Sequence, residues 1–260
     1  MMIQSEKMVS LGSLAAGMAH EINNPLAGIL QNTQVIQNRL KNRLPANLAA
    51  ARELALDLDR MSAYMEKRDI FKMTDAILTA GRRAAAIVSN MLSFSRKSAS
   101  GFVHEDLKML LDQTLELAKS DYNLKKRFDF KKIRIERDYM PGLPKVSCKA
   151  SEIQQVFFNI LSNGAQAMMS DPMNQDPCFF LRLFLEHDMV SVQIQDNGPG
   201  MNAAQRKRIF EPFFTTKSVG EGTGLGLAVS YFIITENHKG RIQVASSPGQ
   251  GSCFTINLPV

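Results

Sequence analysis

Apolar side chains recur at alternating steps of three and four residues along the first forty residues of the chain. This spacing predicts one long helix over residues 2–42 that packs against other helices. One step is irregular, because the step of four from Met18 to Ile22 is followed by a second step of four to Leu26. Pro25 lies inside the second step and removes a backbone donor, so we expect the helix to bend there. The positions of the stripe are Met8, Leu11, Ala15, Met18, Ile22, Leu26, Ile29, Thr33, Ile36 and Leu40.

A second stripe with the same spacing predicts another long helix from residue 70 to about residue 98. Between the two helices a weaker pattern predicts one inserted helix over about residues 46–66, capped by Asn47. Two amphipathic helices of one chain cannot bury both of their stripes, whereas two hairpins can bury them in a four-helix bundle. We therefore expect residues 1–98 to form a homodimeric bundle. The positions of the second stripe are Ile70, Met73, Ile77, Ala80, Ala84, Ile87, Met91 and Phe94.

Beyond a short polar linker at residues 97–101, the pattern changes to mixed helices and alternating strands. Helices are expected over residues 106–120 and 151–170. Strands are expected over residues 102–104, 132–139, 179–186, 190–195, 242–246 and 252–258. Helices set against a mostly antiparallel sheet form a two-layer sandwich. The chain is thus predicted to be an α+β multidomain protein, with a helical hairpin at residues 1–98 and an α/β sandwich at residues 102–260.

Composition narrows the class of protein only slightly. The chain has 260 residues, of which 45% are hydrophobic and 22% are charged, as in ordinary globular proteins. It has neither an apolar run that could span a bilayer nor the apolar core of a signal peptide, so we expect a cytoplasmic protein. Because the first stripe begins almost at Met1, we expect a longer native chain whose upstream sensor is absent here. The three cysteines are widely spaced and are expected to be reduced.

The formal net charge of +6 falls mostly on residues 1–100, which carry 13 basic and 8 acidic side chains. A basic helical segment suits nucleic acid, an acidic membrane surface or an acidic protein partner, but it can also be an ordinary solvated face. The segment has neither interleaved aromatic residues nor a DNA-binding motif. We therefore expect no nucleic-acid partner.

A histidine with polar neighbours lies on the outer face of the first predicted helix. His20 lies between the stripe positions Met18 and Ile22, Glu21 follows it, and Asn24 lies one turn later on the same face. A lone histidine in such a place is most often an ordinary surface residue. A mostly neutral imidazole beside a carboxylate can also act as a nucleophile that captures a phosphoryl group.

Four segments in the second half of the chain together suggest a nucleotide site. Asn159 and Asn163 share one helix face, where two amide oxygens can bind a hydrated hard cation. Residues 196–201, Asp-Asn-Gly-Pro-Gly-Met, follow a strand and offer a carboxylate to an exocyclic amine. Residues 209–217 read Ile-Phe-Glu-Pro-Phe-Phe-Thr-Thr-Lys, and residues 222–227 form a glycine-rich turn that opens a helix. Glycines there free backbone N–H groups for phosphate. No Walker motif occurs in the sequence.

These motifs resemble those of sensor histidine kinases of two-component signalling. The segment His-Glu-Ile-Asn-Asn-Pro, with the preceding Ser-Leu-Ala-Ala-Gly-Met-Ala, is similar to the H-box of that family, and the four segments are similar to its N, G1, F and G2 boxes. The resemblance implies an ATP- and Mg2+-dependent protein-histidine kinase that phosphorylates itself at His20, with Glu21 as base. It also implies transfer to an aspartate of a response-regulator receiver domain, and a phosphatase role for Asn24.

The same resemblance assigns roles within the nucleotide site. It implies that Asn163 binds Mg2+ with Asn159 beside it, and that Asp196 reads adenine. Further residues implied to contact the nucleotide are Gly198 and Gly200 at the base, Lys217 in a mobile lid, and Gly222, Thr223, Gly224, Leu225 and Gly226 at the phosphates. The chain departs from the family at Gly164, where alanine is common, which should weaken that helix slightly. It also has a short lid between Phe214 and Gly222, which we expect to be irregular.

Two alternative functions remain at this point. A gyrase-type ATP-driven machine would use the same nucleotide motifs, but it carries a glutamate as general base where this chain has Asn159, and an amide is a poor base. A catalytically silent dimeric scaffold would keep the fold without the chemistry, and the intact motifs argue against it.

Overall fold

The chain divides into two compact units, Val9–Arg96 and Lys97–Val260, the second of which also includes Met1–Met8. The computed structural model describes residues 2–93, 101–120, 129–217 and 222–260, except for the side chains of residues 2–21, 86, 87 and 89–93. No helix in this described part is long and apolar enough to cross a membrane.

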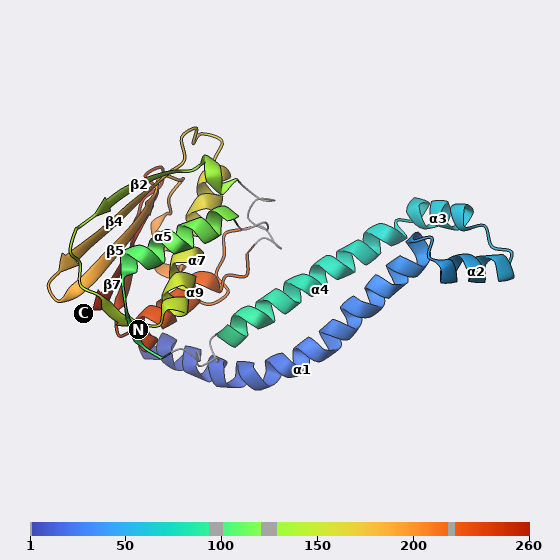
Figure 1. Cartoon of the computed structure of the whole chain (residues 1–260), viewed down its shortest axis with the longest axis horizontal. Helices are drawn as coiled ribbons and strands as arrows, with labels where there is room; N and C mark the ends of the chain where they lie inside the picture. Colours follow the sequence, from blue (N-terminus) through green and yellow to red (C-terminus); the bar gives the residue numbers. More distant parts are fainter. Residues whose placement is uncertain (1, 94–100, 121–128, 218–221) are drawn as a thin grey trace. The chain divides into compact units, whose positions relative to one another are not determined.

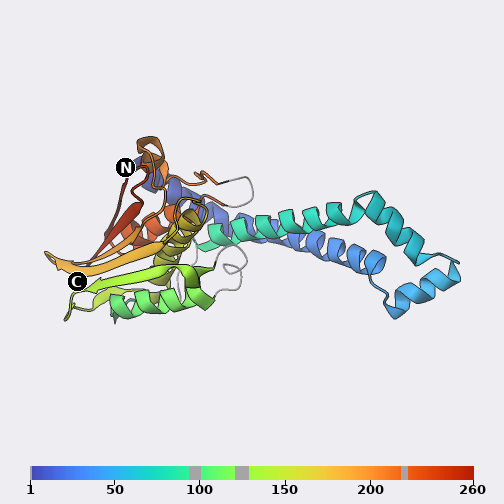
Figure 2. The ribbon, with the colours of Figure 1, turned by 90° about the horizontal axis from the view of Figure 1, so that it is seen from above.

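The first unit is a helical hairpin of α1 (Met2–Lys41) and α4 (Ile70–Ser93), which lie side by side (Figures 1 and 2). The predicted extent of the first helix is confirmed, while residues 94–98 of the second lie outside the described residues. α1 continues through Pro25, and its ribbon is visibly curved. The helices approach closely at Gly81, where an added Cβ would lie 2.6 Å from Leu30 Cδ2.

The inserted segment forms two short helices, so the prediction of one helix over residues 46–66 is wrong. α2 spans Pro45–Glu53 and α3 spans Leu58–Lys67. The break follows from Asp57, whose carboxylate accepts from the backbone N–H groups of Asp59 and Arg60 and thereby begins α3. The prediction that Asn47 caps the inserted helix is also wrong, since its amide donates to the carbonyl of Asn42 at 2.7 Å, just past the end of α1.

α4 carries apolar side chains on two faces. Phe71, Thr74 and Leu78 are buried within the hairpin. The stripe expected from the sequence lies elsewhere on the helix, since two of its residues, Met73 and Ile77, remain 57% and 45% exposed. A single hairpin therefore leaves Met73 and Ile77 of that stripe largely uncovered, whereas Ile70 and Ala84 are half-buried.

The second unit is built on a five-stranded sheet with the order β2-β4-β5-β7-β6. β2 runs parallel to β4, and the other pairs are antiparallel, which confirms the α+β class. β4 and β5, at two of the predicted strands, form an antiparallel hairpin with Phe179 opposite Asp196. The strands are β2 (Arg134–Tyr139), β4 (Cys178–Glu186), β5 (Met189–Asp196), β6 (Arg241–Ser246) and β7 (Ser252–Pro259).

Helices cover one face of this sheet and make the unit two-layered (Figure 1). The covering helices are α5 (Leu107–Ser120), α7 (Ala150–Met169) and α9 (Gly226–Phe232), which continues into the π-helical turn η2 (Ile233–Asn237). Alternation along β4 buries Leu181 and Leu183 and leaves Arg182 exposed. The sequence did not predict three short elements, namely β3 (Val146–Cys148), helix α8 (Ala203–Arg208) and the 3-10 turn η1 (Phe130–Lys132). β3 pairs with β1 (Val103–Glu105).

His238 joins the end of η2 to the start of α7. Its Nε2 accepts from the backbone N–H of Lys149 at 3.1 Å, and its Nδ1 lies 2.8 Å from the carbonyl oxygen of Ile233. Burial lowers the pKa of His238, although the Ile233 carbonyl and the Glu152 carboxylate oppose this shift. A neutral ring is what this arrangement requires, because Nε2 must keep a lone pair for Lys149.

Gly164 lets α7 pack closely on the sheet. A Cβ at this position would lie 2.7 Å from Cε1 of Phe179 and 3.3 Å from Cβ of Asp196. The ring of Phe179 is fully buried and stacks on Phe130 at a centroid distance of 6.0 Å, so it cannot easily move away. The expectation that Gly164 weakens the helix therefore misses its role, since packing on Phe179 excludes a side chain there.

We expect Gly164→Ala to lower the free energy of unfolding by about 1–2 kcal/mol, because overpacking outweighs the gain in helix propensity. Urea denaturation of the variant measures the change. Adding Phe179→Leu to Gly164→Ala should recover part of the loss, because the smaller side chain makes room for the new methyl group. An unchanged or raised stability of Gly164→Ala would contradict this packing account.

Candidate functional site

The two asparagines on α7 face the glycine-rich start of α9. The amide nitrogen of Asn159 donates to the carbonyl of Gly226 at 3.0 Å and to Ser230 Oγ at 3.3 Å. These contacts require a donor at position 159, which a carboxylate would lack. Because the nitrogen is used in this way, the oxygen of Asn159 is the atom that could bind a cation. A Cβ on Gly226 would lie 3.5 Å from that oxygen.

Asn163, one turn later on α7, already binds a positive charge. Its Oδ1 accepts from Lys217 Nζ at 2.8 Å, and the same ammonium donates to Gln166 Oε1 at 2.7 Å. Neutral amide oxygens are suitable ligands for a hard cation such as Mg2+. The ammonium contact shows that the oxygen of Asn163 is accessible to a cation, so this residue fits the predicted metal-binding role.

Asp196 lies at the end of β5, beside the C-terminal half of α7. Its Oδ1 accepts from the backbone N–H groups of Gly198 at 2.9 Å and Ser252 at 3.2 Å. The residue is only 5% exposed, and burial raises the pKa of its carboxyl group, while the two backbone donors act in the opposite direction. Among the described contacts none engages Oδ2. That oxygen is therefore available to accept from the exocyclic amine of a purine.

The glycines after Asp196 allow close contact with the turn between β6 and β7. Gly200 has φ +67, and a Cβ there would lie 2.0 Å from the carbonyl oxygen of Ser247. Gly251, in the opposing turn, has φ +68 and would clash with the carbonyl of Asp196 in the same way. A Cβ on Gly198 would lie 3.0 Å from Asp196 Oδ1. Gly200 and Gly251 thus each lie against a backbone carbonyl of the opposing segment, and only Gly198 lies against the carboxylate itself.

The third and fourth segments also lie against each other. A Cβ on Gly224, which has φ +66, would lie 2.4 Å from the carbonyl carbon of Phe213. A Cβ on Gly222 would lie 2.9 Å from Thr215 Oγ1 and 3.1 Å from Lys217 Cδ. The loop then enters α9 at Leu225 and Gly226, where Leu225 is buried and donates its N–H to Thr223 Oγ1 at 3.4 Å. Most of the predicted lid, residues 218–221, lies outside the described residues.

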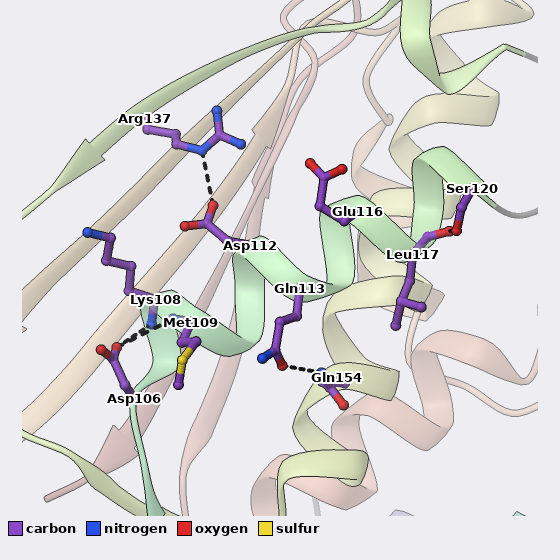
Figure 3. A pocket seen from close by; sticks show the side chains of 10 residues that line it. All are labelled: Asp106, Lys108, Met109, Asp112, Gln113, Glu116, Leu117, Ser120, Arg137 and Gln154. Carbon is purple, nitrogen blue, oxygen red and sulfur yellow. Dashed lines mark hydrogen bonds and ion pairs between the residues drawn. The ribbon is translucent and has the colours of Figure 1, made fainter.

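A separate hollow lies over α5, away from these segments (Figure 3). Asp112 accepts there from Arg137 Nε at 3.1 Å and from the Tyr139 hydroxyl at 3.3 Å. Burial raises the pKa of that hydroxyl. Gln154 and Gln113, which also line the hollow, are joined by an amide hydrogen bond of 3.1 Å. None of the predicted nucleotide residues lines this hollow, so it is not the predicted nucleotide site.

His20, Glu21 and Asn24 lie on α1 in the other unit. The side chains of His20 and Glu21 lie outside the described residues. Asn24 is exposed, one helical turn after His20 along the backbone. The structure thus brings together the predicted residues of the second unit. The histidine segment belongs to the first unit.

Sequence reasoning missed three residues of this site. Gln166 shares Lys217 with Asn163, Ser230 receives the amide of Asn159, and the backbone of Ser252 binds Asp196. Gln166 had a detectable signal, since it lies three residues after Asn163 on the same helix face. The other two come from α9 and β7, and nothing in the local sequence marks their contacts.

Two family models match the chain, in the order that the motifs predict. Residues 10–100 match the His Kinase A (phospho-acceptor) domain. Residues 148–260 match the Histidine kinase-, DNA gyrase B-, and HSP90-like ATPase. A nucleotide domain of this kind alone would fit a gyrase-type machine as well, but the phospho-acceptor domain separates the two classes.

Curated relatives and solved structures agree with these matches. Sporulation kinase E of Bacillus subtilis is 30% identical over 257 residues, covering 99% of this chain and 30% of that protein. Sensor histidine kinase ZraS of Escherichia coli K12 is 32% identical over 262 residues, covering 100% of this chain and 48% of that protein. The chain thus spans about a third to a half of the length of these relatives.

Two solved structures share the fold along almost the whole chain. Full-length ShkA in complex with AMPPNP has a TM-score of 0.65 at 23% identity, covering 95% of this chain and 45% of that one. Histidine kinase ThkA in complex with response regulator protein TrrA has a TM-score of 0.58 at 22% identity, covering 98% and 64%. The chain therefore comprises a phospho-acceptor domain followed by a histidine kinase-type ATP-binding domain, which together are the catalytic core of two-component sensor histidine kinases.

Proposed function

We propose that this chain is an ATP-dependent protein-histidine kinase that phosphorylates His20 and passes the phosphoryl group to an aspartate of a receiver domain. The observation that carries the proposal is the arrangement of two side chains around α7. The buried carboxylate of Asp196, suited to a purine, lies beside this helix, and the amide of Asn163 on the helix already binds a cation. Its relatives are named kinases, and ThkA was solved with a response regulator. These names support the proposed reaction and partner.

The residues of the second unit suggest how ATP is oriented. Asp196 Oδ2 would accept from the adenine amine, while Gly198 and Gly200 keep the base pocket free of side chains. Asn163 and Asn159 would hold Mg2+, which neutralises phosphate charge when it is bound. Phosphoryl transfer depends mainly on such positioning and charge stabilisation.

The residues of α1 would carry the transfer itself. Neutral His20 attacks phosphorus through a ring nitrogen, the bond to the leaving oxygen of ADP breaks, and Glu21 accepts the proton that the ring gives up. The receiver aspartate then attacks the phosphorylated ring in a second transfer.

A second copy of the chain would complete the helical bundle. The exposed stripe of α4, with Met73 and Ile77, and the exposed Ile22, Ile29 and Ile36 of α1 are apolar side chains that a partner hairpin can cover. We therefore include a homodimer in the proposal. Its proposed contact surface lies in the segment that matches the phospho-acceptor model.

A gyrase-type machine receives less support from the site. Such enzymes need a general base for water, and Asn159 is committed as a donor to Gly226 and Ser230. A silent scaffold would bind nucleotide without labelling His20, so the labelling experiment below separates it from the kinase.

Asp196 and Asn163 are expected to affect different parts of nucleotide binding. Asp196→Ala should reduce ADP affinity by at least about 100-fold with or without Mg2+, because a base site built on hydrogen bonds discriminates strongly. Asn163→Ala should remove mainly the Mg2+-dependent part of the affinity. Calorimetric titration with Mg2+ and with EDTA measures both. Wild-type affinity in the two variants would place the nucleotide elsewhere.

His20 is expected to be the sole phosphoryl acceptor. Incubation with γ-labelled ATP should give acid-labile, base-stable label on the wild-type chain. His20→Gln should carry no label while keeping normal ADP affinity, since its unit contains none of the proposed nucleotide residues. Label that persists on this variant would exclude His20, and an unlabelled wild type that binds ATP would favour the scaffold.

Asn24 is proposed to orient a water molecule for hydrolysis of the receiver's phosphoaspartate, which requires hydrogen bonding but no proton transfer. Asn24→Ala should keep autophosphorylation and forward transfer while phosphorylated receiver accumulates. If Asn24 only supports the backbone beside Pro25, all three activities and the melting temperature should fall together. Unchanged receiver dephosphorylation in a stable variant would remove the phosphatase role.

A further inference from the structure

Lys217 binds the oxygen that the proposed function assigns to magnesium. Its ammonium lies 2.8 Å from Asn163 Oδ1 and 2.7 Å from Gln166 Oε1. The two acceptors are three residues apart on α7 and therefore share one face of the helix. Together they form a small site for one cation, made of neutral oxygens and filled by a side chain of the protein itself.

The surroundings of Lys217 favour this placement. Its backbone N–H donates to Thr215 Oγ1 at 3.2 Å, which fixes the direction in which the side chain leaves the loop. A Cβ on Gly222 would lie 3.1 Å from Lys217 Cδ, so the aliphatic stem runs against a glycine of the proposed phosphate loop. The Lys217 side chain thus contacts both Asn163, the proposed metal ligand, and Gly222, in the loop expected to hold phosphate.

A magnesium ion and this ammonium cannot share Asn163 without an anion. Mg2+ binds oxygen at about 2.1 Å, so an ammonium at 2.8 Å on the same oxygen would lie only about 4 Å from the metal. Two cations at that distance in a half-buried site repel strongly. The repulsion is relieved when nucleotide phosphates supply negative charge and accept the ammonium.

We infer that Lys217 occupies the metal-binding oxygen of Asn163 in the absence of nucleotide, and that Mg2+ replaces it only together with the nucleotide. The inference rests on the proposed nucleotide site and adds an order of events to it. The ammonium leaves Asn163 and Gln166 for the phosphates, and the metal takes the vacated oxygen. Lys217 would thereby prevent free metal from binding to Asn163. Its movement to the phosphates would also couple nucleotide binding to the position of Lys217.

Calorimetry separates this role from a merely structural one. Lys217→Met should weaken ADP binding about tenfold in EDTA, where the ammonium is the main cation for the phosphates, and much less in saturating Mg2+. Lys207→Met, which removes an exposed lysine of α8, should leave both affinities unchanged. Equal losses for Lys217→Met in both conditions would overturn the inference.

The order of events can be observed directly through the Lys217 ammonium in a chain labelled with 15N-lysine. Its NMR signal, identified by its absence from Lys217→Met, should stay in place with Mg2+ alone and shift when ADP and Mg2+ are added together. Gln166→Leu should shift the starting signal, because one of the described acceptors of the Lys217 ammonium is removed. A signal displaced by Mg2+ alone, or unmoved by saturating Mg2+ and ADP, would overturn the inference. A wild-type chain that does not bind ADP would overturn the proposed function itself.

Discussion

The side-chain amide of Asn159 joins the helix that carries the proposed metal ligand to the glycine-rich start of α9. Its two donated hydrogen bonds, to Gly226 and Ser230, join α7 to the first turns of α9. α7 is held on the sheet by close packing of Gly164 on Phe179 and Asp196, and Phe157 and Leu161 on the same helix are fully buried. In this position of α7, the side chains of Asn163 and Gln166 both contact Lys217. The chemistry of the site thus depends on how α7 packs.

Periodicity predicted the elements that are long enough to repeat a pattern. The long helices, the β4–β5 hairpin and the β6–β7 pair are found close to where the spacing of apolar residues placed them. β3 has only three residues, which is too short for a period of two to be recognised, and it exists because β1 lies opposite it. The division of the inserted segment was visible only in Asp57, whose role as a cap competes with helix continuation.

The candidate site was predictable as a set of residues but not as a set of contacts. Motif order and the family resemblance singled out Asn163, Asp196 and Lys217 as candidate residues. They could not identify the contact between Lys217 and Asn163, which joins residues 54 positions apart. The case of Gly164 shows the same limit, since helix propensity favours alanine there and only the ring of Phe179, on a strand, explains the glycine. At the contact between a helix and the sheet, tight packing therefore outweighs the helix propensity of the residue.

The helical unit raises a different physical problem, because α4 has more apolar surface than α1 can cover. Phe71, Thr74 and Leu78 form the face that packs within the hairpin, so the exposed Met73 and Ile77 are not needed for the hairpin itself. Leaving such residues in water has a cost in free energy that burial against a partner would remove. The regular spacing of this outer stripe matches the spacing by which helices pack on other helices. Its regularity is therefore better explained by a second copy of the hairpin than by the fold of one chain, which supports the proposed dimer independently of the family to which the chain belongs.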